Sequence, residues 1–137
     1  MKRICVDAAQ VVPWVAEQLG IAPEGWQHPQ GIGLLDGEAL IAGVVYERIS
    51  ACDCNVHIAA LPGGRWLRRD FLAAMFRYPF VQLGLQRITG LVPASNQAAL
   101  RFDLHLGFVV EGICREAMPG DDVVLLRMLR RECRFIE

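Results

Sequence analysis

The apolar residues of the chain alternate between helical spacing and strand spacing. Apolar residues three or four positions apart predict helices over residues 8–19, 65–78 and 96–106. Short apolar runs between turn residues predict strands over 4–6, 31–36, 39–49, 53–61, 86–92, 108–117 and 122–131. A three-strand meander followed by a strand–helix–strand crossover requires antiparallel and parallel pairs together. We therefore expect an α/β or α+β domain built on one mixed sheet.

Turn and capping residues indicate where these elements end. Asp36-Gly37 is a strong hairpin signal between the second and third strands. Pro13 predicts a kink or a restart in the first helix, because proline lacks the amide hydrogen that a helix interior uses. The second helix is expected to end near Pro79, and Ser95 is a candidate cap for the third helix.

Length, composition and charge restrict the class of protein. The chain has 137 residues, of which 53% are hydrophobic and 21% charged, which predicts one folded domain over 1–137 without a linker. The net charge of −1 excludes a global basic field for nucleic acid. The apolar runs are far shorter than the roughly 20 residues that span a bilayer. The five cysteines are odd in number and no signal peptide is evident, so we expect a cytoplasmic protein with reduced thiols and no membrane contact.

The residues PGGR at 62–65 form a turn between a predicted strand and a predicted helix. Exposed amides at such a place bind anions, and glycines let the backbone approach a phosphate. Arg65, Arg68 and Arg69 follow at once, and each opposes the helix dipole by about 0.3–1 kcal/mol. A bound phosphate would reverse that penalty. The alternative is three solvated arginines on a surface turn.

The segment 96–108 reads NQAALRFDLHLGF, with small and apolar residues three and four places after Asn96 and Gly-Phe eleven and twelve places after it. This pattern resembles the signature of the GNAT superfamily of N-acetyltransferases. The continuation VVEGICRE at 109–116 resembles the branch that includes ribosomal-protein alanine acetyltransferases. The order of the predicted elements matches the family along nearly the whole chain, and the segment 128–134 resembles small GNAT-like proteins of phages and prophages.

This resemblance implies the GNAT fold, with a mixed sheet of about six to seven strands, about three to four helices and a splayed pair of parallel strands. It also implies acetyl-CoA as cosubstrate and no metal. The pantetheine would lie between walls at 56–60 and 88–92, and the pyrophosphate on the turn at 61–68. The residues implied for coenzyme binding are Ile58, Ala60, Gly63, Gly64, Arg65, Trp66, Arg68, Arg69 and Asn96.

The chain departs from the family pattern at several of these positions. Gly64 matches the first glycine of the family turn, but Trp66 and Arg68 replace the other two. The indole would either block the phosphate or stack on it, and Pro62 removes one amide from the turn. Asp103 stands where the family often has the tyrosine that serves as general acid, so the resemblance supplies no acid here.

Transfer of an acyl group to an amine requires a base, since a lysine-like amine has a pKa near 10.4. The candidate bases are Glu47, Asp53, His57 and Glu111. Family members often place a carboxylate that works through water near the position of Glu47. Asp53 and His57 are an even number of residues apart on a predicted strand and so share a face, and an imidazole suits a base at neutral pH. The alternatives are carboxylates that face solvent and a packed histidine. Glu111 is also expected to form a structural ion pair with Arg115.

The cysteines predict no metal site. Cys52 and Cys54 form one Cys-x-Cys pair, but no second pair or histidine follows at zinc spacing. We expect Cys5, Cys114 and Cys133 to be small buried hydrophobic residues.

Three hypotheses follow from the sequence. The first is an acetyl-CoA-dependent N-acetyltransferase that transfers the acetyl group directly to an amine, on a protein N-terminus, a small molecule or an antibiotic. The second is a GNAT-like module that binds coenzyme A or a protein partner without catalysis. The third, a metal or redox protein built on Cys52 and Cys54, has the least support. Dimers are common in this fold, so a homodimer fits the first two hypotheses.

Overall fold

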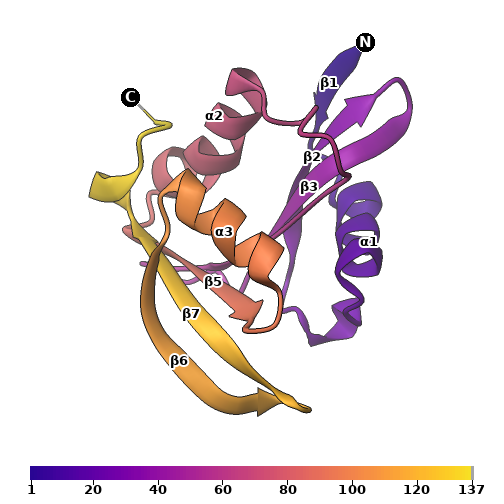
Figure 1. Ribbon diagram of the computed structural model, residues 1–137. Coiled ribbons are helices and arrows are strands. Elements are labelled where there is room, and N and C mark those ends of the chain that lie inside the picture. Colours follow the sequence, from indigo (N-terminus) through magenta and orange to yellow (C-terminus); the bar gives the residue numbers. More distant parts are fainter. Residues whose placement is uncertain (137) are drawn as a thin grey trace.

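The computed structural model describes residues 1–136 of the chain (Figure 1). Its main elements are β1 (Lys2–Cys5), α1 (Ala8–Leu19), β2 (Gln30–Asp36), β3 (Ala39–Glu47), β4 (Asn55–Ala60), α2 (Arg69–Arg77), β5 (Arg87–Pro93), α3 (Gln97–Leu106), β6 (Val109–Met118) and β7 (Asp121–Leu129). Short 3-10 turns cover Pro23–Gly25 and Arg130–Glu132. Every predicted strand and helix is present, although several ends differ. Within the described residues, no helix is long and apolar enough to cross a membrane.

The seven strands form one sheet in the order β1-β2-β3-β4-β5-β7-β6. All neighbours are antiparallel except β4 and β5, which are parallel. The sheet separates α1 from the two other helices, with α2 and α3 on the opposite side (Figure 1). Consecutive residues of β3 show this division, because Val44 belongs to the core beneath α2 and α3 and Val45 to the core beneath α1. The mixed sheet is therefore the expected one.

The first helix shows how the local sequence forms its element. The Asp7 side chain caps it by accepting a hydrogen bond from the Ala9 amide at 3.0 Å. Gly20 ends it with a φ of 67°. The sequence predicted a kink or a restart at Pro13, and the structure shows one helix that runs through Pro13 without a restart. Val11 and Val15 are fully buried against the sheet, and this packing holds the helix together despite the missing amide.

Two predicted helix boundaries were wrong. Helix α2 begins at Arg69 instead of 65, because Trp66 turns into the core and residues 61–68 form a loop. It ends at Arg77, near Pro79 as predicted, and a π turn over Tyr78–Gln82 follows it. The cap of α3 is Asn96, which accepts a hydrogen bond from Ala99 at 3.2 Å, while Ser95 donates to Asp121 at 2.7 Å.

The parallel pair β4–β5 is joined over only two register positions, Asn55 with Thr89 and Val56 with Gly90. Beyond them β4 stays paired with β3 as far as Ala60. Strand β5 likewise stays paired with β7 as far as Pro93. The two strands therefore part from one another, and this is the splayed parallel pair that the sequence resemblance implied.

Candidate active site

The opening between β4 and β5 exposes two strand edges to each other. From His57 to Ala60 the β4 backbone pairs with β3 on one side and has no register partner in β5 on the other. The same is true of β5 from Leu91 to Pro93, which pairs only with β7. Unpaired strand edges carry free N–H and C=O groups, which an extended ligand can use as an added strand. The opening thus lies between residues 57–60 of β4 and 91–93 of β5, which overlap the predicted walls 56–60 and 88–92 only in part.

Side chains alternate between the two faces of β4. Val56, Ile58 and Ala60 belong to the core beneath α2 and α3. Ala59 belongs to the core beneath α1, and His57 shares its face. Side chains of β4 therefore flank the opening on both faces of the sheet, and His57 lies on the α1 side at the first position beyond the last β4–β5 pair.

A buried carboxylate fixes the His57 imidazole. The Glu47 side chain is 3% exposed and contacts His57 Nε2 at 3.0 Å through Oε2. The same oxygen accepts a hydrogen bond from Asn55 Nδ2 at 2.9 Å, and Oε1 accepts one from the Gln27 backbone amide at 3.3 Å. A proton on Nε2 satisfies the contact with Glu47 and leaves Nδ1 as an acceptor. The structure therefore joins two of the predicted bases, Glu47 and His57, into one pair.

An aromatic ring covers this pair on its α1 side. Trp26 stacks on His57, with ring centroids 4.8 Å apart and an interplanar angle of 26°. The His57 side chain keeps 10% of its surface exposed. Glu47 and Trp26 together hold the ring in one orientation.

The structure places Asp53 apart from this pair. It precedes β4 instead of lying within it. Its carboxylate accepts hydrogen bonds from Thr89 Oγ1 at 3.0 and 3.1 Å and lies 3.8 Å from Arg87 Nε. Burial raises the pKa of Asp53, against the opposite effects of Thr89 and Arg87. Asp53 thus bridges the start of β4 to β5, where it ties the junction together.

The expected ion pair between Glu111 and Arg115 does not form. Glu111 instead contacts Arg87 at 2.6 Å and Arg127 at 3.8 Å, and Arg115 contacts Asp122 at 3.0 Å. The cause is an irregularity of β6 between Val110 and Gly112, which leaves Glu111 outside the regular alternation. The Arg87 guanidinium holds the pKa of Glu111 below its ordinary value.

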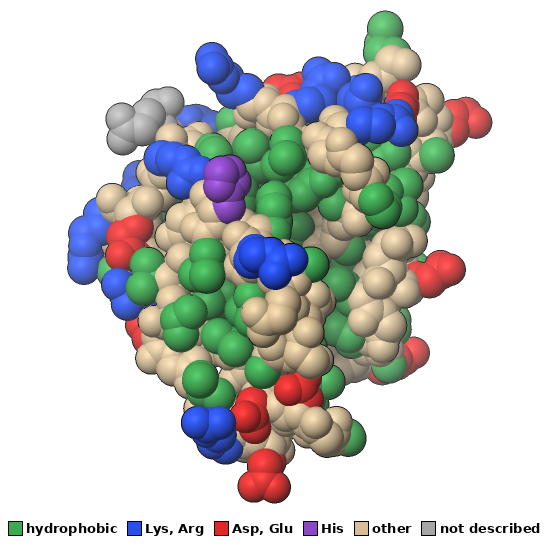
Figure 2. Space-filling view, viewed as in Figure 1, with side chains coloured by type: hydrophobic (Ala, Val, Ile, Leu, Met, Phe, Trp, Pro, Cys, Tyr) green, Lys and Arg blue, Asp and Glu red, His purple; other side chains and the backbone are tan. Residues whose placement is uncertain are grey.

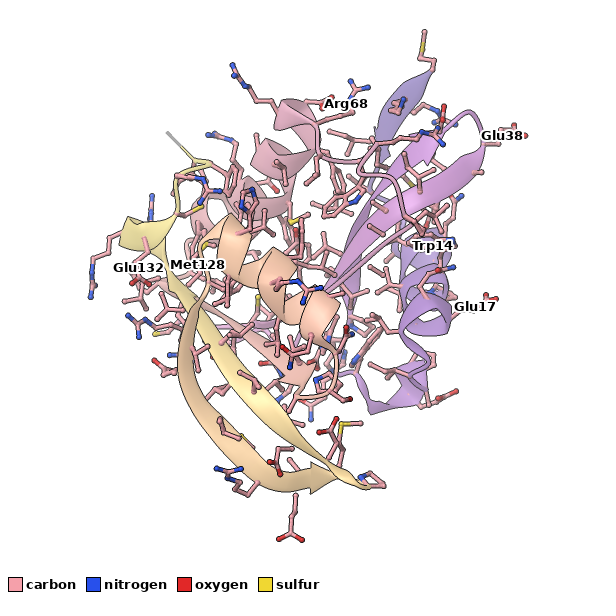
Figure 3. All side chains as sticks on the ribbon, in the orientation of Figure 1. Trp14, Glu17, Glu38, Arg68, Met128 and Glu132 are labelled. Carbon is pink, nitrogen blue, oxygen red and sulfur yellow. The ribbon has the colours of Figure 1, made fainter. Side chains whose placement is uncertain are left out.

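The turn at 61–68 has features of an anion site, although it is longer than predicted. Gly63 and Gly64 have φ values of 109° and 70°, which glycine adopts without strain. Among the described residues, the backbone amides from Gly63 to Trp66 donate no hydrogen bond. Basic side chains gather at this end of the molecule (Figure 2), where Figure 3 labels Arg68.

The three predicted arginines differ in their partners. Arg65 pairs with Asp36 of the β2–β3 hairpin. Arg68 contacts Asp70 at 3.1 Å and lowers the pKa of that carboxyl. Arg69 has no ion pair within residues 1–136. A phosphate at the turn would therefore compete with two existing carboxylate contacts.

The Trp66 side chain points into the core. It is 6% exposed and packs against Phe102 of α3, with ring centroids 4.7 Å apart, and against Phe71 of α2 at 6.3 Å. The indole is therefore part of the core between the two helices and anchors the turn.

Asn96 and Asp103 lie on the same helix, α3. The Asn96 carbonyl caps the helix, and its NH2 group donates no hydrogen bond within the described chain. Asp103 lies one turn from Leu106, which belongs to the core, and one turn from Ala99, which packs against it. Burial raises the pKa of Asp103 to about 7, so the protonated carboxyl persists close to neutral pH.

The raised pKa of Asp103 predicts a specific pH dependence of stability. The folded state binds the Asp103 proton more tightly than the unfolded chain, whose carboxyl titrates near pH 4. This contribution to the free energy of unfolding is fully present below about pH 4 and is lost as the pH rises to about 7. We expect Asp103→Asn to flatten this decline in urea unfolding from pH 4 to 8. Equal slopes in the two proteins would contradict the assignment.

The cysteines do not form one cluster. Cys54 is buried, and burial raises the pKa of its thiol to about 12, whereas Cys52 is exposed. Cys5 and Cys133 are buried as predicted, but Cys114 is exposed because it lies on the edge strand β6. Across residues 1–136, no group of three or more His, Cys, Asp or Glu side chains could hold a metal ion.

Two contributors to the site were missed by sequence analysis. Asn55 is two residues before His57 and on the same face, so the even spacing could have revealed it. Gln27 contributes a backbone amide to Glu47, and its side chain carries no signal of that role.

Comparisons with known proteins bear on the fold. No family model and no curated protein matches the sequence. Among solved structures, the Vibrio cholerae spermidine N-acetyltransferase in complex with CoA and spermine aligns with a TM-score of 0.75 at 16% identity, over 99% of this chain and 98% of that chain. This chain has the GNAT fold. A spermidine N-acetyltransferase SpeG chimera from Vibrio cholerae and hSSAT aligns with this chain at a TM-score of 0.71 and 17% identity, over 95% of this chain and 96% of that chain.

Proposed function

We propose that the protein is an acetyl-CoA-dependent N-acetyltransferase that transfers the acetyl group directly to an amine. One observation carries the proposal: an imidazole held by a buried carboxylate lies at the point where the parallel strands part. His57 is the first β4 residue beyond the last β4–β5 pair, and Glu47 holds its Nε2 at 3.0 Å. A base at this position faces the place where an acyl group lying between the strands would end.

The chain offers groups that suit coenzyme A, which supplies the acetyl thioester. The free strand edges beside Ile58 and Ala60 suit the amides of an extended pantetheine. The unpaired amides from Gly63 to Trp66 and the arginines around them suit a pyrophosphate. The NH2 group of Asn96 is available as a further donor. These roles follow from the geometry and the sequence resemblance together.

The residues of the site can perform two of the proton and charge steps of the reaction. Nδ1 of His57 accepts the proton that the attacking amine loses, and Glu47 stabilises the imidazolium that results. An unpaired N–H of β4 can stabilise the charge that develops on the acyl oxygen. The thiolate then leaves as the amide bond forms.

The first experiment is calorimetric titration with desulfo-CoA and acetyl-CoA, followed by free-thiol release with a panel of amines. The proposal predicts saturable binding of both ligands and amine-dependent thiol release. Absence of binding at millimolar ligand would contradict both the role of the turn in binding pyrophosphate and the role of the opening between β4 and β5 in binding pantetheine. Binding without thiol release from any amine would favour the non-catalytic module instead.

Gly64→Val tests the turn at 61–68 separately from the opening between β4 and β5. A β-branched side chain at a φ of 70° strains the turn, and we expect desulfo-CoA to bind about tenfold more weakly. Gly120→Val is the matched control, because Gly120 has a φ of 71° in the β6–β7 hairpin. Equal affinity of the two variants for desulfo-CoA would contradict the assignment of the turn.

A second candidate function, binding without catalysis, is favoured by the arginine contacts. Arg65 and Arg68 already pair with Asp36 and Asp70, and Pro62 contributes no amide. A protein with this turn could have lost the coenzyme and kept the fold for a partner. The calorimetric titration separates the two candidates.

A further inference from the structure

The α1-side face of β5, β7 and β6 carries two successive rows of uncharged residues beside the opening. In the first row Leu91 of β5 is opposite Leu125 of β7, and in the second Pro93 is opposite Val123. Strand β6 continues these rows with Gly112 and Cys114. The alternate residues of β5 and β7, such as Ile88 and Leu126, are buried on the other face. These two rows, which we call the apolar rows, therefore share the face of His57.

The apolar rows are not covered by a helix. Leu91 is 38% exposed, and Val123 and Leu125 are half-buried. Helix α1 packs over β2, β3 and β4, on the far side of the opening. Because Trp26 stacks on one face of the His57 ring, a molecule would reach the imidazole from the side of Leu91, with the apolar rows along that flank.

The charged groups next to the apolar rows are already neutralised. Arg87 and Arg127 pair with Glu111, and Arg127 also contacts Glu132 at 3.1 Å. Asp53 accepts from Thr89 and lies near Arg87. Glu47 accepts from three donors. These three carboxylates, Asp53, Glu111 and Glu47, therefore already have partners and offer no free charge to a second ammonium group.

We propose that the acceptor is a primary amine that carries an uncharged apolar group, such as an arylalkylamine or alkylamine, and that a polyamine is a poor substrate. The amine lies at His57 and the apolar group lies over Leu91 and Leu125. This inference rests on the proposed acetyltransferase function. It follows from charge complementarity, since a second ammonium ion on the apolar rows would lose its water without gaining a carboxylate.

Thiol release with 2-phenylethylamine, hexylamine, spermidine and a short peptide with a free N-terminus tests the proposal. We expect kcat/KM for the two apolar amines to exceed that for spermidine at least about tenfold, the scale of discrimination that an apolar pocket achieves. A preference for spermidine or for the peptide would overturn the inference and leave the acetyltransferase function standing. Absence of acetyl transfer to all four amines would contradict both this inference and the acetyltransferase function.

Leu125→Glu places a carboxylate within the apolar rows, and Ile113→Glu is its control. Ile113 is 51% exposed and pairs with Val124, which belongs to the core on the other face. We expect Leu125→Glu to lower kcat/KM for phenylethylamine about tenfold and to raise it for spermidine, with desulfo-CoA affinity unchanged and Ile113→Glu without effect. Unchanged selectivity in Leu125→Glu would overturn the proposal. So would conversion of a dimer to a monomer without a change in selectivity, because the rows would then be an interface between copies.

Discussion

Replacement of His57 by Gln is expected to lower kcat for amine acetylation by about 10²–10⁴-fold, the range for loss of a general base. Glutamine retains a group of similar length that can contact Glu47, so the change removes the base with little change in packing. The affinity for desulfo-CoA should stay at its wild-type value, since the imidazole lies on the α1 side of the sheet. Steady-state thiol release and calorimetry measure the two quantities.

His105→Gln is the matched control for this substitution, because His105 is an exposed residue in the last turn of α3. Full activity of His57→Gln would eliminate His57 as the base. Glu47→Gln is also informative, since the amide keeps a contact with the ring but removes the charge that stabilises an imidazolium. If Glu47→Gln lowers kcat about as much as His57→Gln does, the two residues act as a unit.

Replacement of Trp66 by Ala is expected to cost about 3–5 kcal/mol in the free energy of unfolding, as for other buried aromatic side chains. The indole is buried between Phe71 and Phe102, so its removal leaves a cavity between α2 and α3. The same change releases the turn that contains Gly63 and Gly64, and coenzyme affinity should fall with stability. Urea unfolding and desulfo-CoA titration measure both effects.

Two further variants make the Trp66 experiment decisive. Trp66→Phe keeps an aromatic ring against Phe102 and should recover most of the stability and the affinity. Trp14→Ala removes a half-buried indole on the other face of the sheet, labelled in Figure 3, and should lower stability without specifically weakening coenzyme binding. An affinity that rises in Trp66→Ala would mean that the indole obstructs the coenzyme.

The elements of this fold were largely predictable because their signals are local. Apolar spacing located the helices, and Asp36-Gly37 located the β2–β3 hairpin, where Gly37 has a φ of 66°. The start of α2 was not predictable in the same way. Residues 65–68 have helix-forming neighbours, but burial of Trp66 against Phe102, a contact distant in sequence, decides the path of the chain.

The candidate site was predictable in its residues but less so in its arrangement. Glu47 and His57 were both identified, yet their contact depends on the register between β3 and β4, which pairs Glu47 with Asn55 and Val45 with His57. The predicted pairing of Glu111 with Arg115 was wrong because an irregularity in β6 changes which side chains meet. Register and bulges arise from packing of the whole sheet and leave little trace in one strand.

The two-position junction between β4 and β5 divides the sheet into two halves that are joined by few backbone hydrogen bonds. Strands β1–β4 form one ladder and β5–β7 another. The amides of Gln86, Arg87 and Thr89 donate across the junction to the carbonyls of Cys52 and Cys54. A peptide-like ligand that lies between the halves would form hydrogen bonds with the facing edges of both β4 and β5. Binding should then slow amide hydrogen exchange along both facing edges, because the ligand adds hydrogen bonds between two ladders that share few of their own.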